Sequence, residues 1–290
     1  MESGKTDRRT ALKYAGAAIG GLAIGGVVGW SAKPTPTVTP TNSTISTVST
    51  PQAKFAVAPP AGTTVTIIHG FDAAYPPFTE IDPTGKAVGF DVDVLSTIAQ
   101  QNGWTIVEKP WDWSAIVPAL LNGELDIIMS GMTVTAARCD VVTFTLPYYP
   151  YVHYLITLAT EKRSMTDILT SGATIAVQTG GVGDMWATKL LAAGDNFQKL
   201  GLDTYELAMD AVLDGRAVAT ITDSGFSVPY FKENPDKAAL LRVVGTIGGL
   251  SVYAIATRNG DSWLRDQLNL GLENLMGTNT WNDLLNKWDL

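Results

Sequence analysis

The chain has 290 residues, of which 46% are hydrophobic and 17% charged. This size and composition allow one large domain or two modest ones, and they exclude a wholly disordered protein. The formal charge is −8, and residues 61–290 alone carry 14 basic and 26 acidic side chains, or −12. This negative charge argues against nucleic acid as a partner, because a protein binds the phosphates of nucleic acid with a basic surface. With one cysteine, Cys139, and two histidines, no internal disulfide can form, and we expect no metal or other cofactor.

Residues 1–32 have the features of an export signal or an N-terminal membrane anchor. The run Arg8-Arg9-Thr10-Ala11-Leu12-Lys13 precedes an uncharged, glycine-rich stretch, Tyr14–Ala32. Together they resemble a twin-arginine signal, although Ala11 stands where phenylalanine is common. The stretch approaches the roughly 20 residues of a bilayer-spanning helix, and Trp30 stands where a cleavage site before Ala32 would need a small residue. We expect export, with either cleavage or retention as an anchor.

Residues 33–62 form a linker in this interpretation. The segment consists almost entirely of Pro, Thr, Ser, Val and Ala, a composition that buries no core and favours an extended or disordered chain. Asn42-Ser43-Thr44 is a glycosylation acceptor triplet, which is compatible with an exposed tether. The N-terminal fifth of the chain therefore indicates a soluble domain outside the cytoplasm.

The next segment alternates strand and helix patterns, as in a parallel α/β sheet. The predicted elements are a strand Val65–His69, a helix Val92–Gln101, a strand Trp104–Glu108, a helix capped by Ser114 and ending at Leu121, and a strand Leu125–Met129. Small and hydroxyl residues follow the last strand, and then comes one arginine, Arg138. Because ligands bind beyond the carboxyl ends of such strands, this turn suits a planar anion that a guanidinium can grip with two bonds.

The rest of the chain predicts a second α/β unit and a return to the first. Its predicted elements are strands Tyr151–Ala159 and Thr174–Val177, helices Asp184–Ala193 and Tyr205–Leu213, strands Ala217–Thr222, Leu241–Val244 and Ser251–Ala256, and helices Ser262–Met276 and Trp281–Trp288. We assign 63–156 with 254–290 to the first lobe and 157–253 to the second. Two extended crossings between the lobes would make a hinge with a cleft.

These motifs, taken in order, resemble the solute-binding proteins that deliver polar amino acids to ABC importers. The matching stretches are Tyr75-Pro76-Pro77-Phe78, Gly89-Phe90-Asp91-Val92-Asp93, Trp113–Asn122, Asp126–Arg138, Pro147-Tyr148-Tyr149, Ala176-Val177-Gln178 with Gly180, and the turn at Asp223. The resemblance extends from about Thr63 to the C-terminus. It implies a periplasmic-binding-protein fold, in which two α/β lobes hold a ligand between them.

The resemblance also assigns roles within that cleft. The ligand carboxylate would be bound by Arg138, Thr133, Gly131 and Val182, and the ligand ammonium by Asp223 and Gly131. Val182 replaces a hydroxyl residue of the family, so its backbone N–H at a helix start would act alone. The ligand side chain would contact Asp72, Tyr75, Trp113 and Asp91. Asp72 can instead be a capping or solvated residue, and Asp91 can instead cap the following helix. The two aromatic residues can instead belong to the core.

Two carboxylates near the cleft favour Lys, Arg or His as ligand, followed by Gln. The implied partners are the amino acid, the membrane subunits of an ABC importer and, through the N-terminal segment, a membrane; we expect a monomer.

Two other functions use the same fold, namely a dehydratase acting on an amino-acid precursor and a ligand-sensing domain. A catalyst needs a general acid or base beside the substrate, and we expect structural roles for His69 and His153. The sequence therefore favours binding over catalysis.

Overall fold

The structure is a computed structural model that describes residues 53–290. The predicted export signal or anchor (1–32), most of the predicted linker (33–62) and the acceptor triplet at Asn42 lie outside the described residues. Within residues 53–290, no helix is both long enough and apolar enough to cross a membrane.

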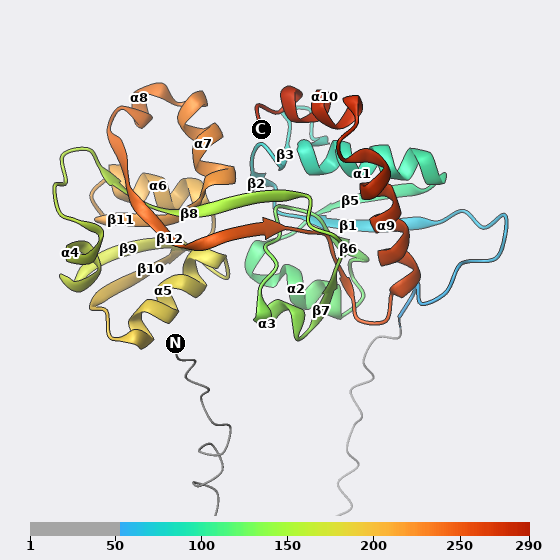
Figure 1. Cartoon of the computed structure of the whole chain (residues 1–290), viewed down its shortest axis with the longest axis horizontal. Helices are drawn as coiled ribbons and strands as arrows, with labels where there is room; N and C mark the ends of the chain where they lie inside the picture. Colours follow the sequence, from blue (N-terminus) through green and yellow to red (C-terminus); the bar gives the residue numbers. More distant parts are fainter. Residues whose placement is uncertain (1–52) are drawn as a thin grey trace, which may run out of the picture. The chain divides into compact units, whose positions relative to one another are not determined.

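A five-stranded sheet with the order β5-β1-β6-β13-β7 forms the centre of the first lobe (Figure 1). Strand β1 is parallel to β5 and β6, whereas β13 is antiparallel to β6 and β7. The strands of this lobe, including a small second sheet β2-β3-β4, are β1 Thr66–Phe71, β2 Ala74–Tyr75, β3 Thr79–Ile81, β4 Ala87–Val88, β5 Thr105–Pro110, β6 Ile127–Ile128, β7 Val142–Phe144 and β13 Ala256–Arg258. Its helices are α1 Phe90–Asn102, α2 Trp113–Leu121, α3 Ala136–Cys139, α9 Ser262–Leu275 and α10 Asn279–Lys287.

The second lobe is built on another five-stranded sheet, with the order β10-β9-β11-β8-β12. Strands β10, β9 and β11 are parallel, and β8 is antiparallel to both β11 and β12. The strands are β8 Tyr149–Leu158, β9 Ala173–Gln178, β10 Phe197–Leu202, β11 Ala219–Asp223 and β12 Leu241–Tyr253. The helices are α4 Met165–Thr170, α5 Val182–Ala193, α6 Tyr205–Leu213, α7 Ser224–Glu233 and α8 Pro235–Ala238.

Strands β8 and β12 run side by side from one lobe to the other (Figure 1). Their register begins at Tyr149 opposite Tyr253 and ends at Leu158 opposite Leu241. The predicted fold class, two α/β lobes joined by a two-strand hinge, is confirmed. The lobe ranges 63–156 with 254–290 and 157–253 stay a prediction; β8 crosses the boundary at 156/157, and β12 ends at the boundary at 253/254.

The structure contains elements that the sequence patterns did not predict. Strand β10 and helix α7 were both missed, and β12 is one strand where two were expected. The ladder between β12 and β8 continues through two register shifts, which lie between Val243 and Gly245 and between Ile247 and Ser251. A β-bulge lets a strand absorb such residues without ending.

Two predicted helix caps were wrong. The N-cap residue of α1 is Gly89, with φ 134°. An added Cβ at this position would lie 2.1 Å from the backbone oxygen of Phe78. Asp91 is therefore inside the helix and does not cap it. Helix α2 begins two residues earlier than expected, with Asp112 before it and Ser114 in its first turn.

The last part of the predicted linker packs on the first lobe. The Phe55 ring is buried, and its backbone N–H donates to Asp261 Oδ1 at 2.7 Å. Lys54 forms an ion pair of 2.5 Å with the buried Asp126. The prediction of an extended or disordered segment therefore fails for these residues, because one aromatic ring buries enough apolar surface to hold them.

Candidate ligand-binding site

The candidate site lies where several strands of both lobes end. In the first lobe, Ser130, Gly131 and Thr133 follow β6, and in the second lobe Asp223 ends β11. The carboxyl edges of the two sheets thus face each other across the hinge, as expected for α/β folds. The residues that line the cavity between them are Asp72, Tyr75, Trp113, Ser130, Gly131, Thr133, Gln178, Val182, Tyr205 and Asp223. Its volume is about 10 Å³, close to the room that one water molecule needs. We call it the inner cavity.

Arg138 is a buried cation that does not itself line this cavity but contacts two residues that do, Thr133 and Trp113. Its side chain comes from the short helix α3, whose start is fixed by Thr135, and the residue is 8% exposed. The guanidinium donates to two backbone oxygens, that of Thr133 at 3.0 Å and that of Gly180 at 3.3 Å. Burial lowers its pKa, and no carboxylate among the described residues forms an ion pair with it. Such a guanidinium is prepared to receive an anionic group.

Asp223 provides the opposite charge from the second lobe. It is 3% exposed and accepts a hydrogen bond of 2.8 Å from the backbone N–H of Phe226, which caps α7. The Tyr75 hydroxyl donates to its carboxylate, 2.9 Å from both oxygens, and lies 2.6 Å from the Tyr253 hydroxyl. Burial raises the pKa of Asp223, and the hydrogen bonds from Phe226 and Tyr75 partly offset that effect. The carboxylate is therefore held in place, and one tyrosine joins the two lobes through it.

The Tyr75 ring packs closely against Gly131, which has no side chain to block it. Gly131 has φ 55°, and an added Cβ would lie 2.3 Å from Tyr75 Cε1. The ring therefore lies directly on the backbone of the turn after β6. Any other residue at position 131 would both strain the backbone and displace the ring.

Asp72 is a second buried carboxylate at the cavity, in the first lobe. It is 7% exposed and accepts from the Ala74 N–H at 2.9 Å and from Gln178 Nε2 at 2.8 Å. The same Gln178 amide nitrogen donates to the backbone oxygen of Asp203 at 3.2 Å. Burial is the main reason that the pKa of Asp72 is raised, and the charge of Asp112 adds to it. Gln178 thus connects the two lobes beside a carboxylate that faces the cavity.

Asp91 does not line the inner cavity, which differs from its predicted place beside the ligand side chain. Its Oδ2 accepts from the Gly131 N–H at 2.7 Å and from the Tyr148 hydroxyl at 2.8 Å. Full burial raises its pKa to about 7. Asp91 therefore stabilises the turn at Gly131, which forms part of the cavity wall, without lining the cavity itself.

The other predicted residues lie at the cavity. Val182 is the first residue of α5, and the position before it, Gly181, makes no side-chain cap, so the N–H groups at this helix start face the ligand region uncapped. The Thr133 hydroxyl lies 2.6 Å from that of Tyr151. The Trp113 ring lies over Arg138, 5.3 Å from ring centroid to Cζ. One face of the indole therefore covers the guanidinium and does not face a ligand side chain.

Neither histidine lines the inner cavity. His69 is fully buried, with Nδ1 2.5 Å from Glu108 and Nε2 2.7 Å from the Met129 oxygen. His153 lies 3.2 Å from the Tyr151 hydroxyl, and burial lowers its pKa to about 4. Both thus contact protein groups behind the cavity wall.

Sequence reasoning missed three residues that line the cavity, Ser130, Gln178 and Tyr205. Gln178 ends β9 just as Asp223 ends β11, so the strand-end rule could have found it. Ser130 lies inside the predicted turn and was passed over in favour of its neighbours. Tyr205 begins α6 and gives no signal in the sequence, since an aromatic residue at a helix start usually belongs to a core.

Two lobes joined by two strands, with a buried anion lining the cavity between them and a buried cation behind its wall, are the architecture of a two-lobed solute-binding protein. Residues 67–290 match the model of the bacterial extracellular solute-binding proteins, family 3. The chain belongs to this family.

Relatives and solved structures agree with that membership. A probable histidine-binding protein of Neisseria gonorrhoeae is 30% identical over 237 residues, covering 82% of this chain and 88% of the relative. A putative ABC transporter arginine-binding protein 2 of Escherichia coli is 27% identical, with coverages of 77% and 90%. Among solved structures, an ancestral arginine-binding protein bound to arginine gives a TM-score of 0.70 at 31% identity, covering 77% of this chain and 97% of that one. The ancestral amino acid-binding protein AncCDT-1, described as a precursor of cyclohexadienyl dehydratase, gives 0.68 at 30% identity, covering 77% and 95%.

Proposed function

We propose that this protein binds a free amino acid between its lobes outside the cytoplasm and delivers it to an ABC importer. One observation carries the proposal. Arg138 and Asp223 are both buried, come from opposite lobes, and form no ion pair with each other or with another described residue. Asp223 lines the inner cavity, and Arg138 contacts Thr133 and Trp113, which line it as well. A zwitterion supplies the carboxylate and the ammonium that these two groups need.

In this proposal the backbone of the ligand bridges the lobes. Arg138, with Thr133 and the N–H of Val182 at the start of α5, binds the carboxylate. Asp223 binds the ammonium together with the backbone of Gly131. Because each end of the ligand is held by a different lobe, full affinity requires the closed arrangement.

The size of the inner cavity adds a step to binding. At about 10 Å³, it accepts no amino acid unless the lobes separate along β8 and β12. The Tyr75 hydroxyl lies on the Asp223 carboxylate, so an incoming ammonium must share or replace that hydrogen bond. Opening, entry of the ligand and closure then follow in that order.

The side-chain preference follows from Asp72. This carboxylate is buried at the edge of the cavity, and a cationic or strongly polar side chain would offset the cost of its burial. Two relatives are named for histidine and arginine, and these names support a basic ligand. We therefore favour Arg, Lys and His, followed by Gln.

Delivery and location rest on the family and on the N-terminal segment. The Escherichia coli relative is named as part of an ABC transporter, which supports membrane subunits of such a transporter as partners. Residues 1–32 would bring the protein out of the cytoplasm by a twin-arginine-like signal, and either cleavage or retention as an anchor remains compatible with the sequence. We propose that the chain acts as a monomer.

The similarity to AncCDT-1, a precursor of a dehydratase by its description, supports one alternative, an enzyme on the same fold. The acids that reach the inner cavity are Asp72 and Asp223, and either could transfer a proton. We nevertheless favour binding without turnover, since both carboxylates accept hydrogen bonds from protein groups and neither histidine lines the cavity.

Calorimetric titration of the full chain with the twenty amino acids tests the proposed function. Basic residues and Gln should bind more tightly than Leu and Glu. Mass spectrometry of each bound mixture tests the alternative. Recovery of the unchanged amino acid supports binding without turnover, whereas a converted product would establish the enzyme.

A further inference from the structure

Three side chains form a hydrogen-bonded chain that runs from the inner cavity into the protein, and we call Thr133, Tyr151 and His153 the Thr133 relay. The Thr133 hydroxyl lies 2.6 Å from the Tyr151 hydroxyl, which lies 3.2 Å from His153 Nε2. Of the three residues, only Thr133 lines the inner cavity. Tyr151 and His153 are two residues apart on the buried face of β8. A joining strand therefore positions the far end of the relay.

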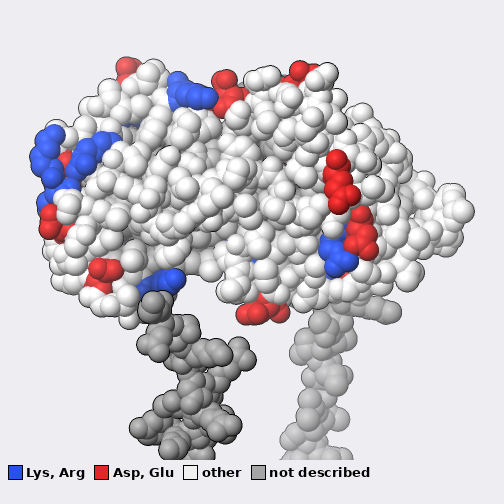
Figure 2. All heavy atoms as spheres, in the orientation of Figure 1, with Lys and Arg blue, Asp and Glu red and all other residues white. Residues whose placement is uncertain are grey.

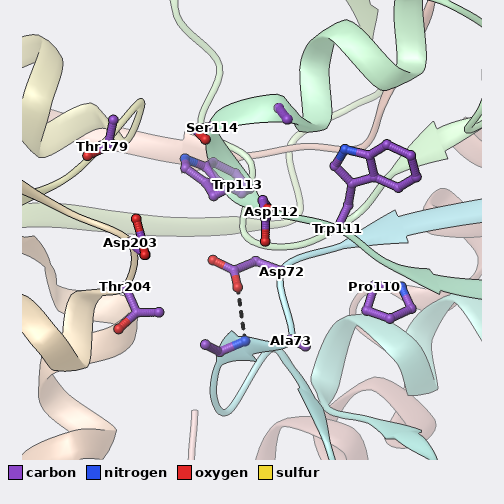
Figure 3. Close-up of a pocket in the computed structure, with 12 residues that line it drawn as sticks. Asp72, Ala73, Pro110, Trp111, Asp112, Trp113, Ser114, Thr179, Asp203 and Thr204 are labelled. Carbon is purple, nitrogen blue, oxygen red and sulfur yellow. Dashed lines mark hydrogen bonds between the residues drawn. The ribbon is translucent and has the colours of Figure 1, made fainter.

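The relay is shielded from water. Its three side chains are at most 5% exposed. A second cavity of about 750 Å³ opens beside the inner cavity, and Figure 3 shows residues that line it, among which Asp72 and Trp113 line the inner cavity as well. No member of the relay lines this larger cavity. Protein groups or a ligand must therefore satisfy the hydrogen bonds of the relay.

His153 has a hydrogen-bond partner for only one of its two ring nitrogens. Burial lowers its pKa to about 4, so at neutral pH the ring is uncharged and carries a proton on one nitrogen. Nδ1 is buried and has no hydrogen-bond partner among the described residues. A buried N–H without an acceptor is rarer in folded proteins than an acceptor without a donor. The favoured tautomer therefore has its proton on Nε2, which donates to the Tyr151 oxygen.

This tautomer sets the direction of the whole relay. The Tyr151 oxygen accepts from His153, so its own single proton goes to the Thr133 oxygen, and the Thr133 proton is left for the inner cavity. Ser251 lies opposite Tyr151 on β12 and hydrogen-bonds to the same hydroxyl. Because a serine hydroxyl can rotate to donate to the tyrosine oxygen, it leaves this direction unchanged. With the other tautomer of His153, Tyr151 would take the proton of Thr133, and only lone pairs would face the cavity.

We propose that His153 is a positioning residue for the carboxylate of the bound amino acid, acting through Tyr151 on the hydroxyl of Thr133. This inference rests on the proposed function, which it deepens by naming what makes Thr133 a donor. A threonine hydroxyl can donate or accept, so without the relay it would fit the ammonium of the ligand as well as its carboxylate. With the relay, Thr133 and Arg138 both offer protons to one end of the ligand, and Asp223 accepts from the other. The relay thus contributes to the orientation of the amino acid between the lobes.

Nuclear magnetic resonance of the imidazole nitrogens tests the tautomer directly. The chain has two histidines, so the ring signals that disappear in His153→Gln belong to His153. We expect an uncharged His153 ring at pH 7 with its proton on Nε2. A proton on Nδ1, or on both nitrogens, would overturn the inference without touching the proposed function.

A double-mutant cycle tests the path from His153 to Thr133. Titration calorimetry on the full chain would measure the arginine affinity of the parent, His153→Leu, Thr133→Val and the double variant. We expect His153→Leu to lower the affinity about three- to tenfold, the contribution of one hydrogen bond, and Thr133→Val about tenfold or more. The double variant should bind like Thr133→Val, since no hydroxyl is then left to orient. An equal loss from His153→Leu with and without the Thr133 hydroxyl would show a purely structural role and overturn the inference.

Two further variants separate the loss of a donor from the loss of packing. His153→Gln keeps an amide N–H for Tyr151 and should retain most of the affinity that His153→Leu loses. Tyr154→Phe is the control, because it removes a hydroxyl from the opposite face of the same strand, and it should bind arginine like the parent. If His153→Gln binds as weakly as His153→Leu, the inference fails, while binding of arginine by the parent leaves the proposed function standing. If the parent binds no amino acid, both fail.

Discussion

Arg138 and Asp223 are the two residues whose burial is hardest to explain without a ligand. Removing a charged side chain from water is expensive, and proteins normally compensate with an opposite charge. Here each is compensated by hydrogen bonds, from Arg138 to backbone oxygens and to Asp223 from a backbone N–H and a tyrosine. Those contacts fix the side chains without neutralising them, which leaves their charge available to a zwitterion.

We predict that Arg138→Ala abolishes amino-acid binding while the protein stays folded. A ligand carboxylate left unpaired in the closed cleft should cost about 3–5 kcal/mol, enough to remove measurable binding. Ligand-induced thermal stabilisation is the measurement. Arg216→Ala, on an exposed side chain, is the control and should respond to ligand like the parent. A thermal shift that survives in Arg138→Ala would show that the carboxylate binds elsewhere.

We predict that Asp223→Asn weakens binding about 10- to 100-fold, the usual contribution of a charged hydrogen bond. Asparagine is also a good helix N-cap, so α7 should keep its start and the melting temperature should change little. Calorimetry at matched salt measures the affinity. Equal affinities of parent and variant would remove Asp223 from the ammonium site.

Asp91 gives a prediction about stability and pH. Its pKa in the folded protein is about 7 because of burial, above the ordinary value of a carboxyl group in an unfolded chain. The folded state therefore binds more protons between pH 4 and 7, and its stability falls as pH rises through that range, by at most about 4 kcal/mol from this group. Asp91→Asn keeps an oxygen for the Gly131 N–H but has no charge to bury. Urea unfolding at pH 5 and pH 8 should show a smaller loss for the variant, and identical losses would contradict the assignment.

How much of the site the sequence predicts depends on how local each contact is. Arg138 was found because it follows a strand and its turn, where α/β folds place ligands, and Asp223 and Asp72 were found through the family resemblance. The Tyr75 hydroxyl bond to Asp223 spans 148 residues and the Gln178 bond to Asp72 spans 106. No pattern within one segment contains such pairs. Asp91 was misplaced for the same reason, because its partner Gly131 is 40 residues away.

At the scale of elements, the joining strands explain both the architecture and the main error in predicting it. Hydrophobic periodicity identified the strands and helices that alternate in each lobe, which was enough for the fold class. Two separate strands were predicted where β12 is one, because the register shifts that let the strand continue depend on its pairing with β8. Figure 2 shows the face over β8 and β12 as largely free of charged side chains, which lie toward its margins. Bending of the joining strands therefore requires few ion pairs to break on this face.

Close packing of α5 on β11 gives a prediction for the second lobe. An added Cβ at Gly183, in the first turn of α5, would lie 2.4 Å from the backbone oxygen of Ile221. Gly183→Ala should therefore push the helix start away from the sheet, destabilise the protein by about 1–3 kcal/mol and weaken ligand binding through the displaced N–H of Val182. Gly249→Ala is the control, because nothing lies within 4 Å of its added Cβ. Chemical unfolding and calorimetry measure the two effects, and a Gly183→Ala protein as stable as the control would contradict this close packing.

At the scale of the whole molecule, binding and closure are one equilibrium. Each end of the proposed ligand is held by one lobe, so a molecule that lacks either end should bind one lobe without drawing in the other. Agmatine is arginine without its carboxylate and N-acetylarginine is arginine without its ammonium. We predict that small-angle X-ray scattering detects a smaller radius of gyration with saturating arginine, and no change with either analogue at the same concentration. Arg138→Ala with arginine should behave like the parent with agmatine. Compaction of the parent by agmatine equal to that by arginine would mean that the side chain alone closes the lobes, and the bridging role of Arg138 and Asp223 would have to be abandoned.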